Sequence, residues 1–195
     1  MRLVSMVMSL TAMSFVCLAT MAHAANSEMN PAVQAELDKW KTVITEWAAD
    51  PKIVKAVVKQ NSKGPIPGMD NAKWKITRPS DPIVKEFQTN PASQFLKAKI
   101  EATGGTISEA FLSAARGEKV AFAEKTTSYI HQGQAKFDVP FTTGQPWQGK
   151  VEYDESSQTY AIQLSVPVLV DGKPSGALVV GVNLRAWLKT RLRPT

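Results

Sequence analysis

Polar and aromatic side chains gather in one predicted loop, residues 125–148. It contains a phenol at Tyr129, an amide at Gln132, an ammonium at Lys136 and an aromatic ring at Phe137. Small-ligand sites combine apolar walls with a few convergent polar groups, and this loop supplies both. Lys136 is the cation that we expect to face a ligand carboxylate, as a point charge. The competing interpretation is a solvated Lys136 and a Tyr129 that packs over the sheet edge.

Two apolar runs near the C-terminal end, 161–169 and 177–183, predict a β-hairpin around Asp171-Gly172, which supplies the positive φ of a tight turn. Alternation places one apolar set on one face of the hairpin: Ile162, Leu164, Val166, Val168, Leu178, Val180 and Val182. The opposite face carries small or polar residues: Ala161, Gln163, Ser165, Ala177, Gly181 and Asn183. Short side chains leave space beside a sheet, so this face predicts a pocket.

The floor of that pocket would come from the strands. Phe111 and Ser113 on one strand, and Gln163 and Ser165 on another, are candidates, although alternation alone does not decide which face they occupy. Phe111 as an ordinary core residue is the competing interpretation. The candidate ligand-binding residues are Phe111, Tyr129, Gln132, Lys136, Phe137 and Ser165.

Catalytic and metal-binding patterns are missing from the sequence. His131 is the only histidine after residue 24, whereas zinc sites draw three or four ligands and a general base needs a positioned partner. We expect His131 to be a solvent-exposed loop residue. There is no nucleophile elbow, phosphate-binding glycine loop or zinc-binding helix motif. The sequence therefore predicts no enzyme activity, no catalytic residue, no metal and no cofactor.

Helices are predicted before strands. Local signals define a long amphipathic helix from Asn30-Pro31 to Asp50-Pro51, a second one stopped by the segment 64–68, and a third over 92–103 closed by Gly104-Gly105. The chain is predicted to consist of a helical leader (30–103), a sheet (106–183) and a C-terminal helix (184–193). The sheet comprises strands over 107–114, 119–124 and 150–154, followed by the two strands of the hairpin. Helices followed by five antiparallel strands indicate an α+β domain.

Residues 1–24 have the pattern of a secretory signal peptide. A single charge at Arg2 precedes an apolar core that ends in Ala22-His23-Ala24. A retained membrane anchor is the alternative, and the interrupting Ser and Thr residues disfavour it. The only cysteine, Cys17, lies in this core, so residues 25–195 have no thiol for disulfides or thiolate chemistry. We expect an exported, periplasmic protein with a single domain over 25–195.

The formal net charge of +6 does not predict a nucleic-acid partner. Much of the excess lies in the segment 185–193, and no basic stripe alternates with stacking aromatic residues. We expect the tail to form a short helix that closes the edge of the domain; a helix lying on a membrane surface is the alternative.

Several segments, taken in order, resemble the Cache (PDC) family of extracytoplasmic sensor domains. They are 114–120, 125–129, 132–133, 135–137, 149–160, 165–168, 171–172 and 176–183. The resemblance implies a PAS-like five-stranded antiparallel sheet with the long N-terminal helix packed along one face. It also implies a ligand pocket on the other face, beneath the loop between the second and third strands.

The sequence and the resemblance together predict an exported, stand-alone sensor module. It would bind a small extracytoplasmic ligand, with a carboxylate as the candidate, and present the occupied state to a membrane receptor or another periplasmic protein. The alternative is a ligand-free periplasmic interaction or accessory protein that uses the helix or the sheet as a docking surface. Trp40 and Trp47, one heptad apart, would then form a homodimer seam if both were exposed.

Overall fold

The computed structural model describes residues 30–154 and 159–186. The predicted signal peptide with Cys17, residues 156–158 between the predicted strand 150–154 and the hairpin, and the part of the predicted C-terminal helix beyond residue 186 lie outside the described residues. No helix among the described residues combines the length and the apolar character needed to cross a bilayer.

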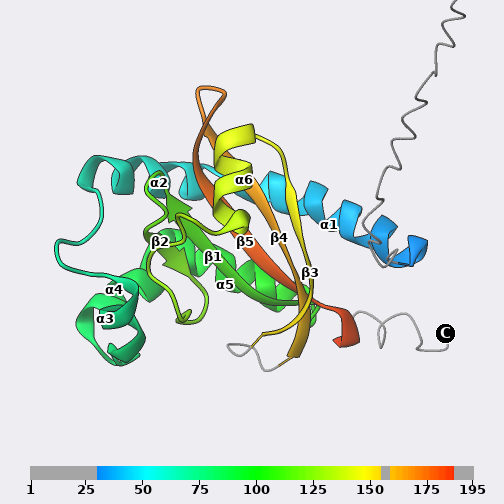
Figure 1. Cartoon of the computed structure of the whole chain (residues 1–195), viewed down its shortest axis with the longest axis horizontal. Coiled ribbons are helices and arrows are strands. Elements are labelled where there is room, and N and C mark those ends of the chain that lie inside the picture. The colour runs from blue at the N-terminus through cyan, green and yellow to red at the C-terminus, as the bar shows by residue number, and fades with distance from the viewer. Residues whose placement is uncertain (1–29, 155–158, 187–195) are drawn as a thin grey trace, which may run out of the picture.

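Five helices precede the first strand (Figure 1): α1 (Pro31–Ala48), α2 (Pro51–Lys63), α3 (Asn71–Ile76), α4 (Pro82–Thr89) and α5 (Pro91–Ala102). Four of them begin with one local signal, an Asn or Asp cap followed by proline; the caps are Asn30, Asp50, Asp81 and Asn90. Each cap side chain accepts a hydrogen bond from a backbone N–H in the first turn, which is worth about 0.5–2 kcal/mol. The three predicted helices are confirmed as α1, α2 and α5, and α3 and α4 are two further short helices.

The strands form one antiparallel sheet in the order β2-β1-β5-β4-β3, which is PAS-like. Their bounds are β1 (Ile107–Ala114), β2 (Lys119–Phe122), β3 (Trp147–Asp154), β4 (Thr159–Val170) and β5 (Lys173–Asn183). The predicted hairpin joins β4 to β5, with φ of 49° at Asp171 and 75° at Gly172. The predicted fold class, an α+β domain with a long N-terminal helix on a five-stranded antiparallel sheet, is confirmed.

One predicted loop contains a helix. Within residues 125–148, helix α6 spans Ala135–Thr143 and packs against β4 and β5. Local signals for it are weak, because Gln134 at its start makes no side-chain cap and Pro140 lies inside it. Gly144 ends it in the left-handed conformation, with φ of 69°.

Helices cover the two faces of the sheet differently (Figure 1). Helices α1, α2 and α5 lie on one side and α6 on the other. The first side, which we call the helical face, buries the predicted apolar hairpin set together with Leu37, Ile44, Ile53, Val57 and Leu96. On the second side, Trp74, Phe87, Phe111, Phe122 and Tyr129 form a separate aromatic cluster beside α3 and α4. We call the second side the cavity face.

The predicted tryptophan seam is not exposed. Trp47 is 6 % exposed and belongs to the core of the helical face, and the half-buried Trp40 packs against the same core. The condition for the seam, exposure of both rings, is therefore not met. A homodimer through another surface stays a prediction.

Candidate functional site

A cavity of about 590 Å³ opens on the cavity face. Its wall is formed by Glu109 and Phe111 of β1, Thr126–Ser128 and His131 of the loop, Lys136 of α6, Trp147–Lys150, Glu152 and Tyr153 of β3, and Ala161 and Gln163 of β4. This volume lies within the range of roughly 300–1,000 Å³ that is usual for small-molecule sites. The predicted pocket is thus found on the expected face and partly beneath the expected loop.

A glycine in the central strand lets the two flanking strands meet across the cavity floor. Gly181 of β5 is paired with Glu109 on one side and with Gln163 on the other. A Cβ atom at Gly181 would lie 2.8 Å from Cγ of Glu109. The missing side chain leaves room for the Gln163 Nε2 to donate a hydrogen bond to Oε1 of Glu109, at 2.6 Å.

Lys136 extends this contact into a polar chain across three elements. Its Nζ donates to Oε1 of Gln163 at 3.0 Å, so one amide joins an ammonium to a carboxylate. The contact fixes the Gln163 amide with its oxygen toward Lys136 and its nitrogen toward Glu109. Lys136 is half-buried and lines the cavity, which excludes the fully solvated alternative for this residue.

His131 lies in the cavity wall, and the expectation of a solvent-exposed residue was wrong. It is 2 % exposed, and its ring stacks on that of Phe111, with centroids 4.6 Å apart and planes 29° apart. Its backbone N–H donates to the carbonyl of Gly117 at 2.8 Å. Gly117 has φ of 76°, and a Cβ there would collide with the backbone nitrogen of Gln132. A glycine turn therefore lets the loop lie close against the sheet.

The charge state of His131 follows from this burial. Desolvation holds the pKa of the imidazole far below its ordinary value, and the positive charge of the neighbouring Lys136 lowers it further. The imidazole is therefore neutral near pH 7. A neutral ring can accept or donate a hydrogen bond in the cavity without adding charge.

The structure brings two of the six predicted ligand-binding residues, Phe111 and Lys136, into the cavity wall. Phe111 fits both interpretations, because it also belongs to the aromatic cluster and is only 1 % exposed. Tyr129 is fully buried, with its ring centroid 5.4 Å from that of Trp74, and its hydroxyl accepts the backbone N–H of Ile66 at 2.9 Å. This placement matches the alternative in which Tyr129 packs beside the sheet.

The other three predicted residues also lie outside the cavity lining. Gln132 is exposed, and Phe137 is buried and stacks on Phe141 with centroids 5.1 Å apart. Ser165 is fully buried on the cavity face, paired with Val179 of β5. A ligand role for these three residues would require them to become accessible from the cavity.

Sequence reasoning missed Glu109, His131 and the residues of β3 as parts of the cavity. Glu109 carried a usable signal, because it is the one charged residue of β1 and lies two positions before Phe111. No sequence signal indicated that β3 contributes to the cavity, because this contribution depends on the pairing of β3 with β4 at the sheet edge. Among the described residues, no cluster of three or more His, Cys, Asp or Glu side chains could hold a metal ion.

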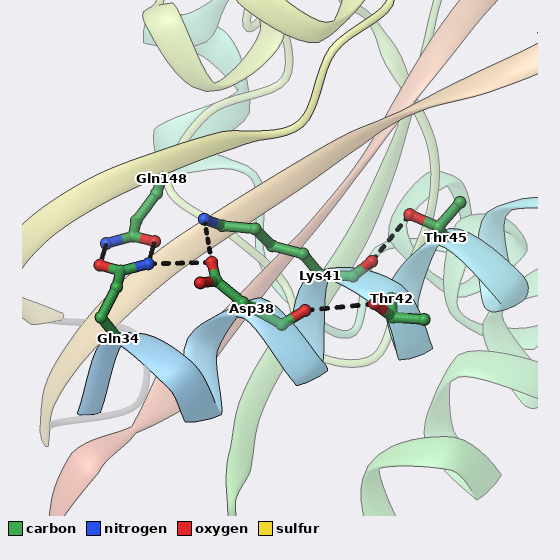
Figure 2. A network of polar contacts seen from close by, with 6 residues as sticks. All are labelled: Gln34, Asp38, Lys41, Thr42, Thr45 and Gln148. Atoms are coloured by element: carbon green, nitrogen blue, oxygen red, sulfur yellow. Dashed lines mark hydrogen bonds and ion pairs between the residues drawn. The ribbon is translucent and has the colours of Figure 1, made fainter. Parts of the chain in front are cut away.

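A wall residue of the cavity is tied to helix α1 (Figure 2). Gln148 of β3 and Gln34 of α1 exchange two side-chain hydrogen bonds of 3.0 Å. Gln34 also donates to Asp38 at 2.9 Å, and Asp38 accepts a further hydrogen bond from Lys41 at 2.8 Å. These hydrogen bonds hold the pKa of the Asp38 carboxyl below its ordinary value. Movement of Gln148 would thus break or shift its hydrogen bonds to Gln34 on the surface of α1.

No protein-family model matches the sequence, and no curated protein does. Solved structures do match. The sensor domain of the histidine kinase DctB from V. cholerae overlaps with a TM-score of 0.55 at 17 % identity, over 83 % of this chain and 54 % of that one. The sensor domain of E. coli DcuS overlaps with a TM-score of 0.51 at 10 % identity, over 82 % and 98 %. The Campylobacter jejuni chemoreceptor Tlp3, solved with isoleucine bound, gives 0.47 at 15 % identity, over 84 % and 60 %.

The chain spans about half of the DctB domain and nearly all of the DcuS domain. These neighbours are Cache/PDC-type extracytoplasmic sensor domains. The described chain therefore has the Cache/PDC-type sensor fold, as the sequence resemblance implied.

Proposed function

We propose that this protein is an exported Cache/PDC-like sensor module that binds a small carboxylate in the cavity described above and presents the occupied state to a partner. The partner would be a membrane receptor or another periplasmic protein. The observation that carries the proposal is the chain Lys136–Gln163–Glu109 in the wall of a cavity of about 590 Å³, within a sensor fold. The module has no catalytic role in this proposal.

The lining contains two cations, Lys136 and Lys150, and two carboxylates, Glu109 and Glu152, and the cations are the groups that would bind a ligand carboxylate. The Lys136 ammonium has three donor hydrogens, and it donates one of them to the neutral amide of Gln163. Lys150 of β3 adds a second cation to the lining. Phe111 and Trp147 provide apolar surface beside these cations, which strengthens a charge-assisted hydrogen bond by excluding water.

Gln148 provides a route from the cavity to the protein surface. A ligand that contacts Gln148 would compete for the amide group that now bonds to Gln34. The position of α1 or the exposure of its polar side chains would then depend on occupancy. Helix α1 is accordingly the surface that we expect a partner to recognise.

A thermal-shift screen tests the proposal. Small carboxylates and amino acids are added to the purified chain, and a compound that binds only the folded state raises the melting temperature in a concentration-dependent way. Stabilisation by at least one carboxylate, and by none of the matched primary amides, is the expected result. If no compound in the panel stabilises the protein, a ligand-free interaction role replaces the sensor role.

Substitution of the predicted cation sharpens the test. Lys136→Met should weaken carboxylate binding by about 10- to 100-fold, because a hydrogen bond to a charged group contributes about 1.5–3 kcal/mol. Lys75→Met is the matched control, because Lys75 is exposed on α3 and is not part of the cavity lining. Equal affinities for the two variants would remove Lys136 from the site.

A further inference from the structure

Four buried side-chain atoms on the cavity face make no hydrogen bond to any described residue. They are Ser113 Oγ, Lys119 Nζ, His131 Nδ1 and Ser165 Oγ. Strand pairing places Ser113 two residues along β1 from Phe111 and opposite Lys119 of β2. Buried polar atoms in native proteins nearly always have a partner, so a group of such atoms beside a cavity indicates a site that a ligand completes.

Lys119 is the strongest member of this group. It is fully buried, and its Nζ lies 3.2 Å from the centre of the Phe111 ring, which forms part of the cavity wall. Lys136 Nζ lies 5.8 Å from the centre of the same ring. Two lysine amines thus lie close to one aromatic ring, one lining the cavity and the other fully enclosed.

We propose that Lys119 is a second ligand-binding residue of this cavity, which stays uncharged beside Phe111 while the cavity is empty and takes up a proton when an anionic group of the ligand reaches it. The inference rests on the proposed function and adds to it the charge of the ligand and a proton that binds with it. The proton comes from solvent and is held on Nζ, and no bond other than N–H is formed.

The electrostatic environment supports an uncharged amine in the empty site. Desolvation lowers the pKa of Lys119 well below its ordinary value, and the charge of Lys136 acts in the same direction. The carboxylate of Glu109 opposes both effects. The other titratable neighbours are His131, which is neutral, and Glu118, whose Oε2 accepts the backbone N–H of Arg116 at 3.1 Å.

An incoming carboxylate reverses this balance. Opposite charges attract strongly in a site of low dielectric constant, so the bound anion raises the pKa of Lys119. The Phe111 ring lies between the cavity and the amine, so the ring has to move for the ligand to reach Lys119. Affinity for an anion then falls as the pH rises, by at most tenfold per pH unit for one proton, between the Lys119 pKa of the empty state and that of the bound state.

Isothermal titration calorimetry tests the inference, with acetate, lactate and L-isoleucine as the probes. Titrations in Tris and in HEPES, whose ionisation enthalpies differ, give the number of protons taken up per ligand bound. We expect uptake of up to one proton by the wild-type protein and a dissociation constant that rises several-fold from pH 7 to pH 8. Lys119→Met should bind more weakly, without proton uptake and without this pH dependence. The control Lys75→Met should match the wild type.

The possible results separate the two proposals. Binding without proton uptake, or unchanged uptake in Lys119→Met, overturns the role of Lys119 and leaves the sensor proposal intact. If none of the three probes binds, the carboxylate-binding proposal fails and this inference fails with it. A lysine with only a packing role would leave the proton count unchanged when methionine of similar shape replaces it.

A second measurement covers the case in which Lys119→Met does not fold. Lysine labelled with ¹³C at Cε reports the titration of each amine in the wild-type protein by NMR. One lysine should titrate at lower pH than all others in the empty protein and should move to higher pH when acetate is added. If every lysine titrates together, or if acetate moves none of them, the inference is wrong.

Discussion

The two faces of the sheet use alternate residues of the same strands for opposite purposes. On β4, Leu164 enters the apolar core beneath α1 and α2, whereas its neighbour Gln163 joins Lys136 to Glu109 in the cavity wall. On β5, Val180 packs in that core, and the adjacent Gly181 leaves open the floor of the cavity. The helical face therefore stabilises the fold, and the cavity face keeps polar groups in a buried position where a ligand could reach them.

Burial of polar groups lowers the stability of the empty protein on the cavity face, whereas the helical face has no such cost. Burial of apolar side chains on the helical face is favourable and needs no further partner. On the cavity face, the buried Lys119 and His131 give up hydration without a complete set of hydrogen bonds. Buried groups that cost stability in the empty protein are a common property of binding sites, and this makes the comparison testable.

The largest effect is expected from adjacent substitutions on β4. Leu164→Ala should lower the free energy of unfolding by about 2–5 kcal/mol, because it leaves a hole in the apolar core. Gln163→Ala should cost less, about 1–3 kcal/mol, because it removes one hydrogen bond to the buried Glu109, and it should also weaken carboxylate binding. Urea denaturation and calorimetric titration measure the two quantities. Equal losses of stability in the two variants would contradict the assignment of stability to the helical face and of ligand binding to the cavity face.

The next effect concerns the turn that positions His131. Gly117→Ala forces both a positive φ and a collision with the backbone of Gln132, so it should cost more than the roughly 1 kcal/mol of backbone strain alone. Gly172→Ala is the matched control: its φ is 75°, and nothing lies within 4 Å of the added Cβ. Chemical denaturation of both variants gives the difference. If Gly117→Ala loses no more stability than Gly172→Ala, the loop that contains Gln132 can move away from the added Cβ at little cost in free energy.

The third prediction concerns the effect of His131 on how the free energy of unfolding depends on pH. The unfolded chain binds a proton at the imidazole below about pH 6.5, and the folded chain does not, because burial depresses the pKa. Acid therefore favours the unfolded state, and His131 lowers stability by up to about 1.4 kcal/mol for each pH unit below 6.5. His131→Phe, which keeps an aromatic ring against Phe111, should remove this part of the slope between pH 6.5 and pH 5. An unchanged slope in that variant would mean that His131 is accessible to protons in the folded protein.

The smallest effect is expected where the cavity wall meets α1. Gln34→Ala removes the paired amide contact with Gln148 (Figure 2) and should cost less than about 1 kcal/mol, because the contact is only partly buried. Gln94→Ala, at an exposed position of α5, is the control. Thermal unfolding with and without acetate measures stability and binding together. A loss of acetate binding without loss of stability would identify Gln34 as part of the link between the cavity and α1.

Much of the fold could be predicted because its signals are local. The caps at Asn30, Asp50, Asp81 and Asn90 mark helix starts through hydrogen bonds to their own first turns. Helix α6 was missed for the converse reason: it lacks a side-chain cap and contains Pro140. Its position depends instead on packing against β4 and β5, which no local pattern encodes.

The cavity could be predicted only in part. The small and polar alternation of the hairpin indicated an open face, and Phe111 and Lys136 were found because each has a side chain suited to a ligand site. His131 was predicted to be in solvent, because its burial follows from a turn at Gly117, fourteen positions earlier in the chain. Tyr129 was assigned to the ligand, whereas its hydroxyl meets Ile66 from a distant segment.

The sequence by itself determined which strand residues are apolar and which are short or polar, and hence that one side of the sheet would close and the other would stay open. Tertiary structure alone decided which polar groups meet on the open side. Pairing of β5 with both β1 and β4 aligns Glu109, Gly181 and Gln163 in one row, and α6 then brings Lys136 to its end. The physical reason is that side-chain alternation is a property of each strand, whereas strand order and register are set by contacts between segments far apart in the chain.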